Sequence, residues 1–519
     1  MNAAISELGR GHVRSSELSR SARENRISGF TIAWLLLVAV VSTGMFCVVK
    51  DGLIDDTYIT LASARNLALH GHWGMIPQET ANSATSPLNV LLLAAATAVL
   101  RIAGGEHTVV ALGVLFVGCM VVIAWGWLRL SRALHLATWV SGLGTLVVLV
   151  NPFVLSATGL EVHLIAAVLV MLGAMAAEGR PVMYGVVSGI ALVTRLDLVI
   201  FVLLIALATP AIRRRLGWVL VALGVVGLPW YVFSWLVIGS AIPDTFVIKT
   251  LQHSFAGVTY VDGPNFYLYN RRHFWPTLWS FLPAAFGAIA LLAWFWVRRP
   301  TRLWPLAALG LGGGVYYVAY SVMGVPPYQW YFVAPIVALS MFAVGALGAL
   351  GRVASGRPNL ARRWLTGSGV VLMVAVIAGA GTIDVRHGIP WRTTPVFGNW
   401  ATPADYAAVG LALHQRIGDA TVEAPAEIGT LAYYCDCAIV DPFSDGGRTS
   451  ELIEKRIDQA GPFSRFILRM NYLWLVRGRL PRPAQYKLTW LEGPGSGPDV
   501  WQVWSPATGI GHLVLTSLP

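Results

Sequence analysis

Charged residues are scarce in this sequence. Asp, Glu, Lys and Arg make up 12% of the 519 residues and hydrophobic residues 56%, whereas an average soluble domain carries about twice that charged fraction. Long apolar runs recur from Phe30 onward, each close to the ~20 residues with which a helix crosses a bilayer. The composition excludes an ordinary soluble protein and predicts an integral membrane protein with several transmembrane helices.

Cysteine is equally rare, because the chain has only four, too few for a disulfide scaffold. Cys47 and Cys119 lie in apolar runs, where packing explains them. Cys435 and Cys437 form a lone C-x-C, for which two thiols on a strand is the simplest interpretation. The sequence has no zinc-type Cys and His spacing and no Gly-rich phosphate loop, so neither a structural metal nor a nucleotide-binding loop is predicted.

Basic residues are concentrated in short segments between apolar runs. The net charge of +11 therefore follows the positive-inside pattern of membrane proteins and does not indicate a nucleic-acid partner. The tail up to Ser28 carries five of these Arg residues, and the apolar run Phe30–Val49 follows it. We interpret this run as a signal anchor with a cytoplasmic N-terminus. Later clusters are Arg129 with Arg132, Arg213 to Arg215, Arg298 to Arg302, and Arg352 to Arg363.

Neighbouring cytoplasmic clusters must be separated by an even number of crossings. Three apolar stretches lie between the tail and Arg129, and the middle one, Leu88–Ile102, is short and contains Arg101. We interpret it as an interfacial helix over 87–103, within a first external loop over 50–107. About eleven transmembrane helices result. The predicted spans are Phe30–Val49, Thr108–Leu128, Ala137–Leu155, Val162–Ala177, Val182–Val193, Leu198–Ile212, Leu216–Gly239, Thr277–Val297, Leu303–Met323, Tyr331–Leu350 and Trp364–Ile383.

The C-terminal part has a different pattern. Helices are predicted over Pro403–Ile417, with Thr402 as the N-cap, and over Ser450–Gln459, and short strands over Thr421–Ala424 and Ala438–Val440. Such alternation indicates a small α/β domain. We expect a cytoplasmic tail over 1–29, a transmembrane domain over 30–383 and an extracytoplasmic domain over 384–519, in a protein of the plasma (inner) membrane.

Asp55 and Asp56 are the first candidates for chemistry, because they begin the external loop just beyond the first span. Adjacent carboxylates at a membrane surface can act as a general base, with a pKa raised by mutual repulsion and partial burial. They can also hold a divalent cation through their oxygens. The simplest alternative is an acidic helix N-terminus favoured by the helix dipole.

Three further candidates lie at predicted outer ends of spans. Arg195 at the tip of a short hairpin can clamp a phosphate or simply pair with Asp197. Lys249 follows an outward-going span, and its loop contains further basic residues. The loop can form a basic rim around an anionic headgroup, or it can anchor the chain at the membrane interface. Glu161 begins a span. It can contact substrate, or it can simply be an acidic residue at a helix N-terminus, where the helix dipole favours a negative charge. The other bases of that loop are His253, Arg271, Arg272 and His273.

Several short motifs occur in a fixed order along the chain. They are Ile54 to Ile59, Ala64 to Ala68, Thr85 to Leu88, Gly159 to Glu161, Thr194 to Asp197, Pro243 to Thr245 with Lys249, Ile428 to Tyr434, and Val440 with Asp441. This order resembles the GT-C type of membrane glycosyltransferase, and within it the actinobacterial arabinofuranosyltransferases that add terminal arabinose to cell-wall arabinan. Leu196 stands where that group usually has Pro.

The resemblance implies a GT-C fold and an inverting glycosyl transfer on the outer face. Asp55 or Asp56 would supply the catalytic base, and the donor would be a polyprenyl-phosphate sugar. The acceptor would be a cell-envelope glycan or glycolipid. No cofactor is required, although the acidic pair can hold a divalent cation. Candidate donor-phosphate and substrate residues are Arg195, Lys249, Glu161, Arg65 and His253.

Two other classes of protein remain as alternatives. A transporter or flippase of lipid-linked sugars would use the same basic rim without chemistry, and broken helices with charges at the bilayer midplane would favour it. A non-catalytic glycan-binding membrane protein would not need the carboxylate pair.

Overall fold

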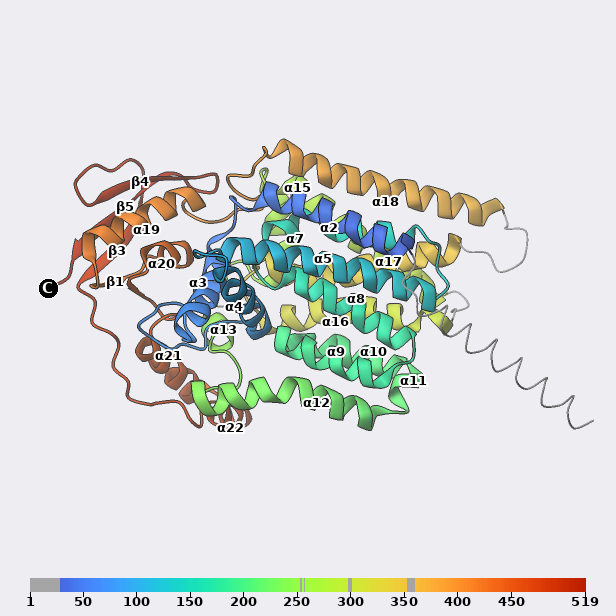
Figure 1. The fold of residues 1–519 in the computed structure, drawn as a ribbon, viewed down its shortest axis with the longest axis horizontal. Coiled ribbons are helices and arrows are strands. Elements are labelled where there is room, and N and C mark those ends of the chain that lie inside the picture. Colours follow the sequence, from blue (N-terminus) through green and yellow to red (C-terminus); the bar gives the residue numbers. More distant parts are fainter. Residues whose placement is uncertain (1–28, 253, 256, 297–300, 352–359) are drawn as a thin grey trace, which may run out of the picture.

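Apolar helices lie side by side along the long axis of the molecule, and a small β-sheet with its own helices sits at one end of them (Figure 1). The computed structural model describes residues 29–252, 254–255, 257–296, 301–351 and 360–519. In this part of the chain, seven helices are long and apolar enough to cross a membrane. They are α2 (Gly29–Val49), α5 (Thr108–Ala133), α12 (Leu216–Phe233, extended by a π-helical turn at Ser234–Ile238), α15 (Phe274–Trp296), α16 (Trp304–Met323), α17 (Val333–Gly351) and α18 (Leu360–Arg386).

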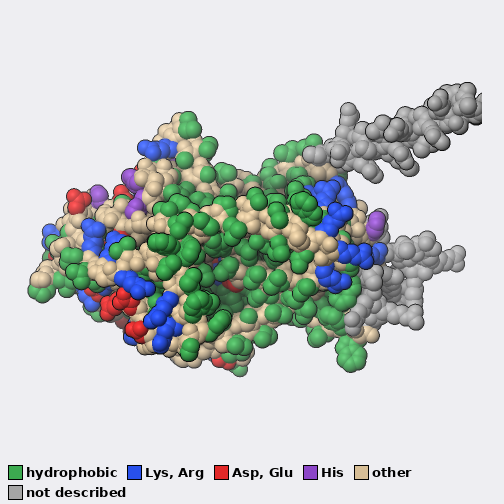
Figure 2. Space-filling model, turned by 90° about the horizontal axis from the view of Figure 1, so that it is seen from below, with side chains coloured by type: hydrophobic (Ala, Val, Ile, Leu, Met, Phe, Trp, Pro, Cys, Tyr) green, Lys and Arg blue, Asp and Glu red, His purple; other side chains and the backbone are tan. Residues whose placement is uncertain are grey.

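The surface of the bundle is apolar where lipid would contact it. Figure 2 shows hydrophobic side chains over the middle of the molecule and Lys and Arg gathered towards its two ends. Val40 on α2 and Val225 on α12 are each 70% exposed, which is unfavourable in water and expected in a bilayer. The predicted fold class, a mainly helical membrane protein with a small C-terminal α/β domain, is confirmed.

Shorter apolar helices occupy the other predicted spans. They are α6 (Val140–Leu149), α8 (Val162–Ala177), α9 (Pro181–Thr194) and α10 (Val199–Ala208), which a 3-10 turn at Leu196–Leu198 precedes. The single span predicted over Ala137–Leu155 is wrong in detail. Pro152 has no N–H to continue α6, and Asn151 instead caps α7 (Pro152–Ser156) by accepting the N–H groups of Phe153 and Val154 at 3.1 and 3.3 Å. The count of eleven needs all of these short segments to cross and stays a prediction.

The first external loop contains two helices at the sheet end of the bundle, α3 (Asp55–His70) and α4 (Pro87–Arg101). α4 has nearly the bounds predicted for the interfacial helix. Among the predicted cytoplasmic anchors that the structure describes, the C-terminal end of α5 with Arg129 and the segment after α10 with Arg213 lie at the opposite end of the bundle (Figure 1). Arg129 and Arg180 both pair with Glu178 there. The anchors at 1–28, 298–299 and 352–359 lie outside the described residues. The arrangement agrees with the parity argument, while the side of the membrane on which each end lies stays a prediction.

The C-terminal sheet has the strand order β2-β1-β3-β5-β4. Its strands are β1 (Thr421–Glu423), β2 (Ala438–Val440), β3 (Tyr486–Glu492), β4 (Val500–Ser505) and β5 (Gly509–Ser517). β1 is parallel to β2 and β3, and β5 is antiparallel to β3 and β4. The sequence analysis predicted only β1 and β2.

Four helices complete this domain: α19 (Pro403–Ile417), α20 (Gly429–Cys435), α21 (Gly446–Gln459) and α22 (Pro462–Asn471). α19 has the predicted bounds, and its predicted cap Thr402 accepts the N–H of Asp405 at 3.1 Å. α21 begins before the predicted Ser450, because Asp445 accepts the N–H of Gly447 at 2.8 Å and caps the helix. Cys435 and Cys437 form a disulfide, so the interpretation as two thiols is wrong.

The remaining elements are short. They are α11 (Pro210–Arg213), α13 (Thr245–Gln252), α14 (Gly263–Tyr269) and 3-10 turns at Tyr260–Asp262, Thr301–Leu303 and Gln329–Phe332.

The first external loop also belongs to the sheet domain, because Ala62, Met75 and Ile76 are buried in the core of that domain with Val422 and Leu431. α3 therefore lies at the seam between the two parts of the molecule.

Candidate active site

A cavity of about 790 Å³ lies between the bundle and the C-terminal domain. α3 forms one wall, and α13 with the aromatic segment 328–330 forms another. Residues 397–400 and 426–428 close the cavity from the side of the sheet domain, while Glu161 and Arg195 line it from the transmembrane helices. Asp55, Asp56 and Lys249 line it as well, so five of the seven candidate residues meet in one cavity.

Asp55 holds the C-terminal domain against α3. Its carboxylate accepts the backbone N–H groups of Ile428, Gly429 and Thr430 at 3.1, 2.9 and 2.7 Å. Burial raises the pKa of Asp55, and the N–H groups of Thr430 and Gly429 act against that rise. Since both carboxylate oxygens are engaged, Asp55 is built to position residues 428–430.

The same seam explains why Gly stands at position 429. A Cβ atom there would lie 2.0 Å from the backbone oxygen of Asp55, a distance that no side chain allows. The close approach lets the ring of Tyr58 on α3 pack at 5.5 and 5.8 Å from the rings of Tyr433 and Tyr434.

Arg65 belongs to this seam and does not line the cavity. Its guanidinium donates to the backbone oxygen of Tyr433 at 2.8 Å, pairs with Asp436, and lies 4.9 Å from the centre of the Tyr433 ring. The geometry therefore does not support the prediction that Arg65 binds substrate. Arg65 joins α3 to the C-terminal end of α20.

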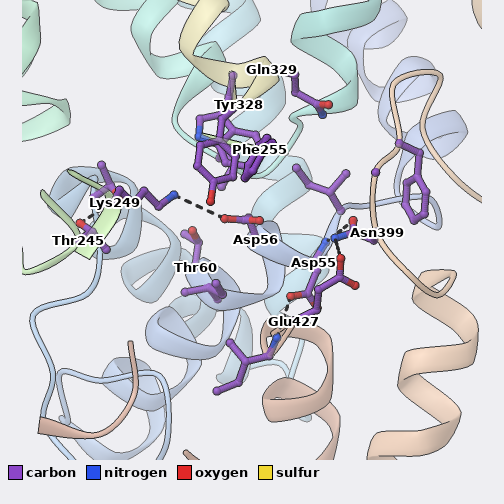
Figure 3. A pocket seen from close by; sticks show the side chains of 18 of the residues that line it. Asp55, Asp56, Thr60, Thr245, Lys249, Phe255, Tyr328, Gln329, Asn399 and Glu427 are labelled. Carbon is purple, nitrogen blue, oxygen red and sulfur yellow. Dashed lines mark hydrogen bonds and ion pairs between the residues drawn. The ribbon is translucent and has the colours of Figure 1, made fainter. Parts of the chain in front are cut away.

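Asp56 points away from Asp55 and into the cavity. Figure 3 shows Asp56 on α3 and Lys249 on α13 pointing toward each other, with 3.8 Å between Oδ1 of Asp56 and Nζ of Lys249. The Asp56 side chain is 30% exposed and that of Lys249 13%. Burial raises the pKa of Asp56, although the ammonium of Lys249 acts to lower it.

Lys249 is held by aromatic rings and by the start of its helix. Its ammonium lies 4.5 Å from the ring centre of Tyr328 and 5.2 Å from that of Trp330, distances at which a cation is attracted to a π face. Just before α13, buried Asp244 donates its N–H to the backbone oxygen of Asn82 at 2.8 Å and accepts the Ser240 hydroxyl at 2.9 Å. These bonds fix α13 to the external loop.

Arg195 is already paired within the protein. It donates to Glu161, to Asp197 at 2.6 Å and to the Tyr320 hydroxyl at 2.7 Å. With the further bond from Nε to Asp197, these contacts take four of its five N–H donors, counting partners in the described part of the chain. Two carboxylates surround one guanidinium. The ion pair between Arg195 and Asp197, which the sequence offered as the alternative to a phosphate clamp, is therefore present.

The basic rim is smaller than the sequence suggests. Arg271 and Arg272 line the cavity and are exposed, and neither has an ion pair among the described residues. Burial lowers the pKa of His273 to about 4, so this lining residue is neutral at neutral pH. His253 lies outside the described residues.

Glu427 and Asn399 are site residues that the sequence analysis missed. Glu427 accepts the N–H of Trp400 at 3.0 Å and the Tyr406 hydroxyl at 2.6 Å. It also accepts the Asn399 amide at 3.0 Å, and the amide oxygen of Asn399 accepts the N–H of Asp55 at 3.2 Å. Burial, helped by the charge of Asp55, raises the pKa of Glu427 to about 8. Glu427 directly precedes the motif that begins at Ile428, which was the available signal.

The acidic pair does not form a shared cation site. The two carboxylates point to different sides of α3 (Figure 3), and both oxygens of Asp55 accept backbone N–H groups. A cation held by both residues would need its oxygen ligands to converge. In the described residues, no group of three or more His, Cys, Asp or Glu side chains is placed to hold a metal ion.

Comparisons with known proteins bear on the fold. No family model and no curated protein matches the chain. Among solved structures, ArnT from Cupriavidus metallidurans bound to undecaprenyl phosphate matches with 13% identity and a TM-score of 0.55, over 93% of this chain and 98% of that one. Oligosaccharyltransferase AglB from Archaeoglobus fulgidus, in complex with an inhibitory peptide and a dolichol-phosphate, matches with 12% identity and a TM-score of 0.53, over 89% of this chain and 70% of that one.

Arabinofuranosyltransferase AftD from Mycobacteria matches with 13% identity and a TM-score of 0.50, over 93% of this chain and 40% of that one. At identities this low, the structural similarity shows a shared fold and nothing more. The chain has the GT-C fold that its sequence motifs predict, the fold in which these three membrane glycosyltransferases are built.

Proposed function

We propose that the protein is an inverting membrane glycosyltransferase that transfers a sugar from a polyprenyl-phosphate donor to a cell-envelope glycan or glycolipid. One observation carries the proposal: a carboxylate and an ammonium, Asp56 and Lys249, face each other in a cavity between apolar helices and a polar domain. A base beside a cation suits a reaction in which a hydroxyl loses a proton and a phosphate gains charge.

The acceptor hydroxyl gives its proton to the carboxylate of Asp56, and its oxygen forms a bond to the anomeric carbon of the donor. The bond from that carbon to the phosphate oxygen breaks, and polyprenyl phosphate leaves with the electron pair. Lys249 stabilises the charge that grows on the leaving phosphate. Attack from the face opposite the leaving group inverts the configuration.

Asp56, and not Asp55, is the base in this scheme. A general base needs a free carboxylate within hydrogen-bond reach of the hydroxyl, and the oxygens of Asp55 already accept three backbone N–H groups. Arg195 and Glu161 shape the floor of the site, where their mutual ion pair limits what either can offer a substrate.

The structural neighbours support the class of donor. ArnT is bound to undecaprenyl phosphate and AglB to a dolichol-phosphate, and both are lipid-linked phosphates. AftD is an arabinofuranosyltransferase, which together with the sequence motifs favours arabinofuranose as the sugar. We place the site on the outer face of the plasma (inner) membrane. The disulfide of the C-terminal domain supports this side, since disulfides persist mainly outside the cytoplasm.

A side cavity offers a place for the acceptor. It has a volume of about 350 Å³ and shares the lining residues Gln252, Ala426 and Phe443 with the main cavity. It lies where the parallel strands β1 and β2 end, the edge at which α/β sheets commonly bind ligands. Asp441 supplies an acceptor for sugar hydroxyls through Oδ2, since its Oδ1 accepts the N–H groups of Phe443 and Ser444. Phe443 supplies an aromatic face for a sugar ring, while Glu423 is paired with Arg448 and Lys487.

The decisive experiment is a transfer assay with the purified protein. A radiolabelled polyprenyl-phosphate arabinofuranose and an arabinan oligosaccharide should give a longer labelled oligosaccharide, and Asp56→Asn should abolish it. A flippase would instead move the labelled lipid across a vesicle without consuming it, and a glycan-binding protein would retain the oligosaccharide without extending it. Either result with no transfer from any polyprenyl-phosphate sugar would overturn the proposal.

A further inference from the structure

α22 carries an apolar stripe on its outside. Phe463, Phe466, Ile467 and Met470 are 78%, 61%, 44% and 43% exposed, and their spacing of i, i+3, i+4 and i+7 places them on one face of the helix. The exposed side chains of Leu473 and Trp474 follow directly in the chain. In a water-soluble domain such a stripe faces the core, so this one requires another apolar partner.

The opposite side of α22 is held mainly at the C-terminal end of the helix, since no residue within α22 is buried. Tyr472, directly after the helix, is 1% exposed and buried with Ile453 and Ile457 of α21 and Val247 of α13. Leu468 packs against the same cluster. Since the inner face is fixed in this way, the apolar stripe faces outward as a stable feature of the fold.

The stripe continues a surface that faces lipid. The indole N–H of Trp235, in the turn that extends α12, donates to the backbone oxygen of Met470 at 2.9 Å. The ring of Trp235 also lies 6.3 Å from that of Trp474. Along α12, exposed apolar side chains run up to this point, including Leu228 at 58% and Val237 at 67%. Figure 1 shows α22 at the end of α12 that adjoins the sheet domain.

The charge of this segment is entirely positive. From Gly461 to Leu491 the chain has no Asp or Glu, and it has five Arg and one Lys. Arg469 on α22 and Arg477 after it are exposed and have no ion pair among the described residues. An apolar stripe flanked by Arg is the pattern of a helix that lies in the surface of an anionic bilayer.

We propose that α22 lies in the membrane surface, with the stripe 463–470 in the acyl boundary and Arg469 and Arg477 at the lipid phosphates. α22 is then a second, monotopic contact of the C-terminal domain with the bilayer, in addition to the chain connection through α18. The partner is the lipid itself, because the stripe is continuous with the lipid-facing side of α12.

This contact also bears on the active site, a consequence that rests on the proposed function. The cluster beneath α22 contains Val247, which lies on α13 two residues before Lys249. Lipid that holds α22 therefore also holds the helix that presents the ammonium to the donor phosphate.

The test places a dye on the stripe of the full-length protein in vesicles of phosphatidylethanolamine and phosphatidylglycerol. Phe466→Cys in a Cys47→Ser background carries an environment-sensitive dye, and Leu411→Cys on α19, a position that is 54% exposed, carries the same dye as the control. We expect lipids with a nitroxide near the headgroup to quench the dye at 466 and aqueous iodide to quench the dye at 411. Quenching by iodide alone at 466 would overturn the proposal. Shielding at 466 from both quenchers would also overturn it, because a protein would then cover the stripe.

Activity separates this inference from the proposed function. The double change Phe463→Ser and Phe466→Ser should raise the KM for the lipid-linked donor several-fold, while the change of both to Leu should leave it near the original value. The dye experiment needs no turnover, so a protein without transferase activity would still show whether α22 lies in the bilayer.

Discussion

The ammonium of Lys249 lies 3.8 Å from the carboxylate of Asp56, whereas the carboxylate of Asp55, adjacent in the chain, accepts three backbone N–H groups from residues 428–430. The adjacent residues Asp55 and Asp56 thus have different roles. Asp55 fixes the C-terminal domain on α3, and Asp56 faces the cavity beside Lys249, the least exposed Lys of the described residues.

The first prediction separates the two carboxylates. Asp56→Asn should lower turnover at least ~10²-fold, because the amide cannot take a proton, with little change in the thermal unfolding midpoint. Asp55→Asn should lower the midpoint, because an amide NH2 facing backbone N–H donors loses bonds worth ~1–3 kcal/mol. Transfer assays and unfolding curves on both variants measure this. A large loss of turnover in Asp55→Asn at an unchanged midpoint, with normal turnover in Asp56→Asn, would reverse the assignment.

The second prediction concerns the donor phosphate. Lys249→Met should weaken binding of the polyprenyl-phosphate donor by ~10–100-fold, the loss expected when a charged hydrogen bond of ~1.5–3 kcal/mol is removed. Lys249→Arg should keep part of the affinity, since it keeps the charge. The matched control is Lys455→Met, which removes an exposed Lys from α21. Equal donor affinity in Lys249→Met and the control would exclude a phosphate contact.

The third prediction concerns Arg195. Removing it as Arg195→Met leaves the buried Glu161 and the half-buried Asp197 without their cation. Breaking a buried ion pair typically costs ~3–5 kcal/mol, so the yield of folded protein should fall. Adding Glu161→Gln and Asp197→Asn should restore folding, because the carboxylates that need a cation are then gone. The activity of this triple variant decides the role. Full turnover means that the cluster is structural, and loss of turnover in a folded protein means that the cluster of Arg195, Glu161 and Asp197 contributes to substrate binding or catalysis.

The fourth prediction concerns topology. α4 should not cross the membrane, because a crossing would invert every later cytoplasmic cluster. Reporters inserted at Gly71, before α4, and at Gly105, after it, should both lie on the outer side. Both glycines have a positive φ. A Cβ atom at Gly71 would meet nothing within 4 Å, and one at Gly105 would meet only the side chain of His107, at 3.1 Å, so insertion there disturbs little packing. Reporters on opposite sides would refute the eleven-span arrangement.

The transmembrane part of the fold was predictable because its signals are local. Apolar runs and Arg clusters gave the helices, and the shortness of Leu88–Ile102 identified α4. The break at Asn151 depends on a cap and a Pro, which a hydropathy pattern does not register. β3 to β5 were missed. In β3 the pattern is weak, because only Leu488 is buried. In β5 the buried residues Gly511, Leu513 and Leu515 do alternate with more exposed ones, so that signal was available.

The individual residues of the site could be predicted from the sequence, but the contacts that each of them makes could not. The motifs located Asp55, Asp56, Glu161, Arg195 and Lys249. Their roles depend on partners far away in the chain, such as the backbone of residues 428–430 for Asp55. Glu427 has no sequence pattern of its own beyond its place directly before the motif at Ile428, and its role follows only from its contacts with Asn399 and Tyr406.

The last prediction uses Glu427 to test the contact between the two parts of the molecule. Burial and the charge of Asp55 raise the pKa of Glu427 to about 8, whereas an unfolded chain would give its usual value near ~4.3. Between these values the folded protein holds a proton that the unfolded chain has released, so stability falls as the pH rises through about 8. The unfolding midpoint should therefore be lower at high pH than at low pH. Glu427→Gln cannot lose a proton, so its midpoint should fall less over the same range. The remaining fall in this variant reports on the other carboxylates whose pKa is raised by burial, including Asp55, Asp56 and Asp441. Unfolding curves of both proteins measured across this range provide the test. Equal slopes would mean that Glu427 is solvated and does not hold Asn399 in the position where it accepts the N–H of Asp55.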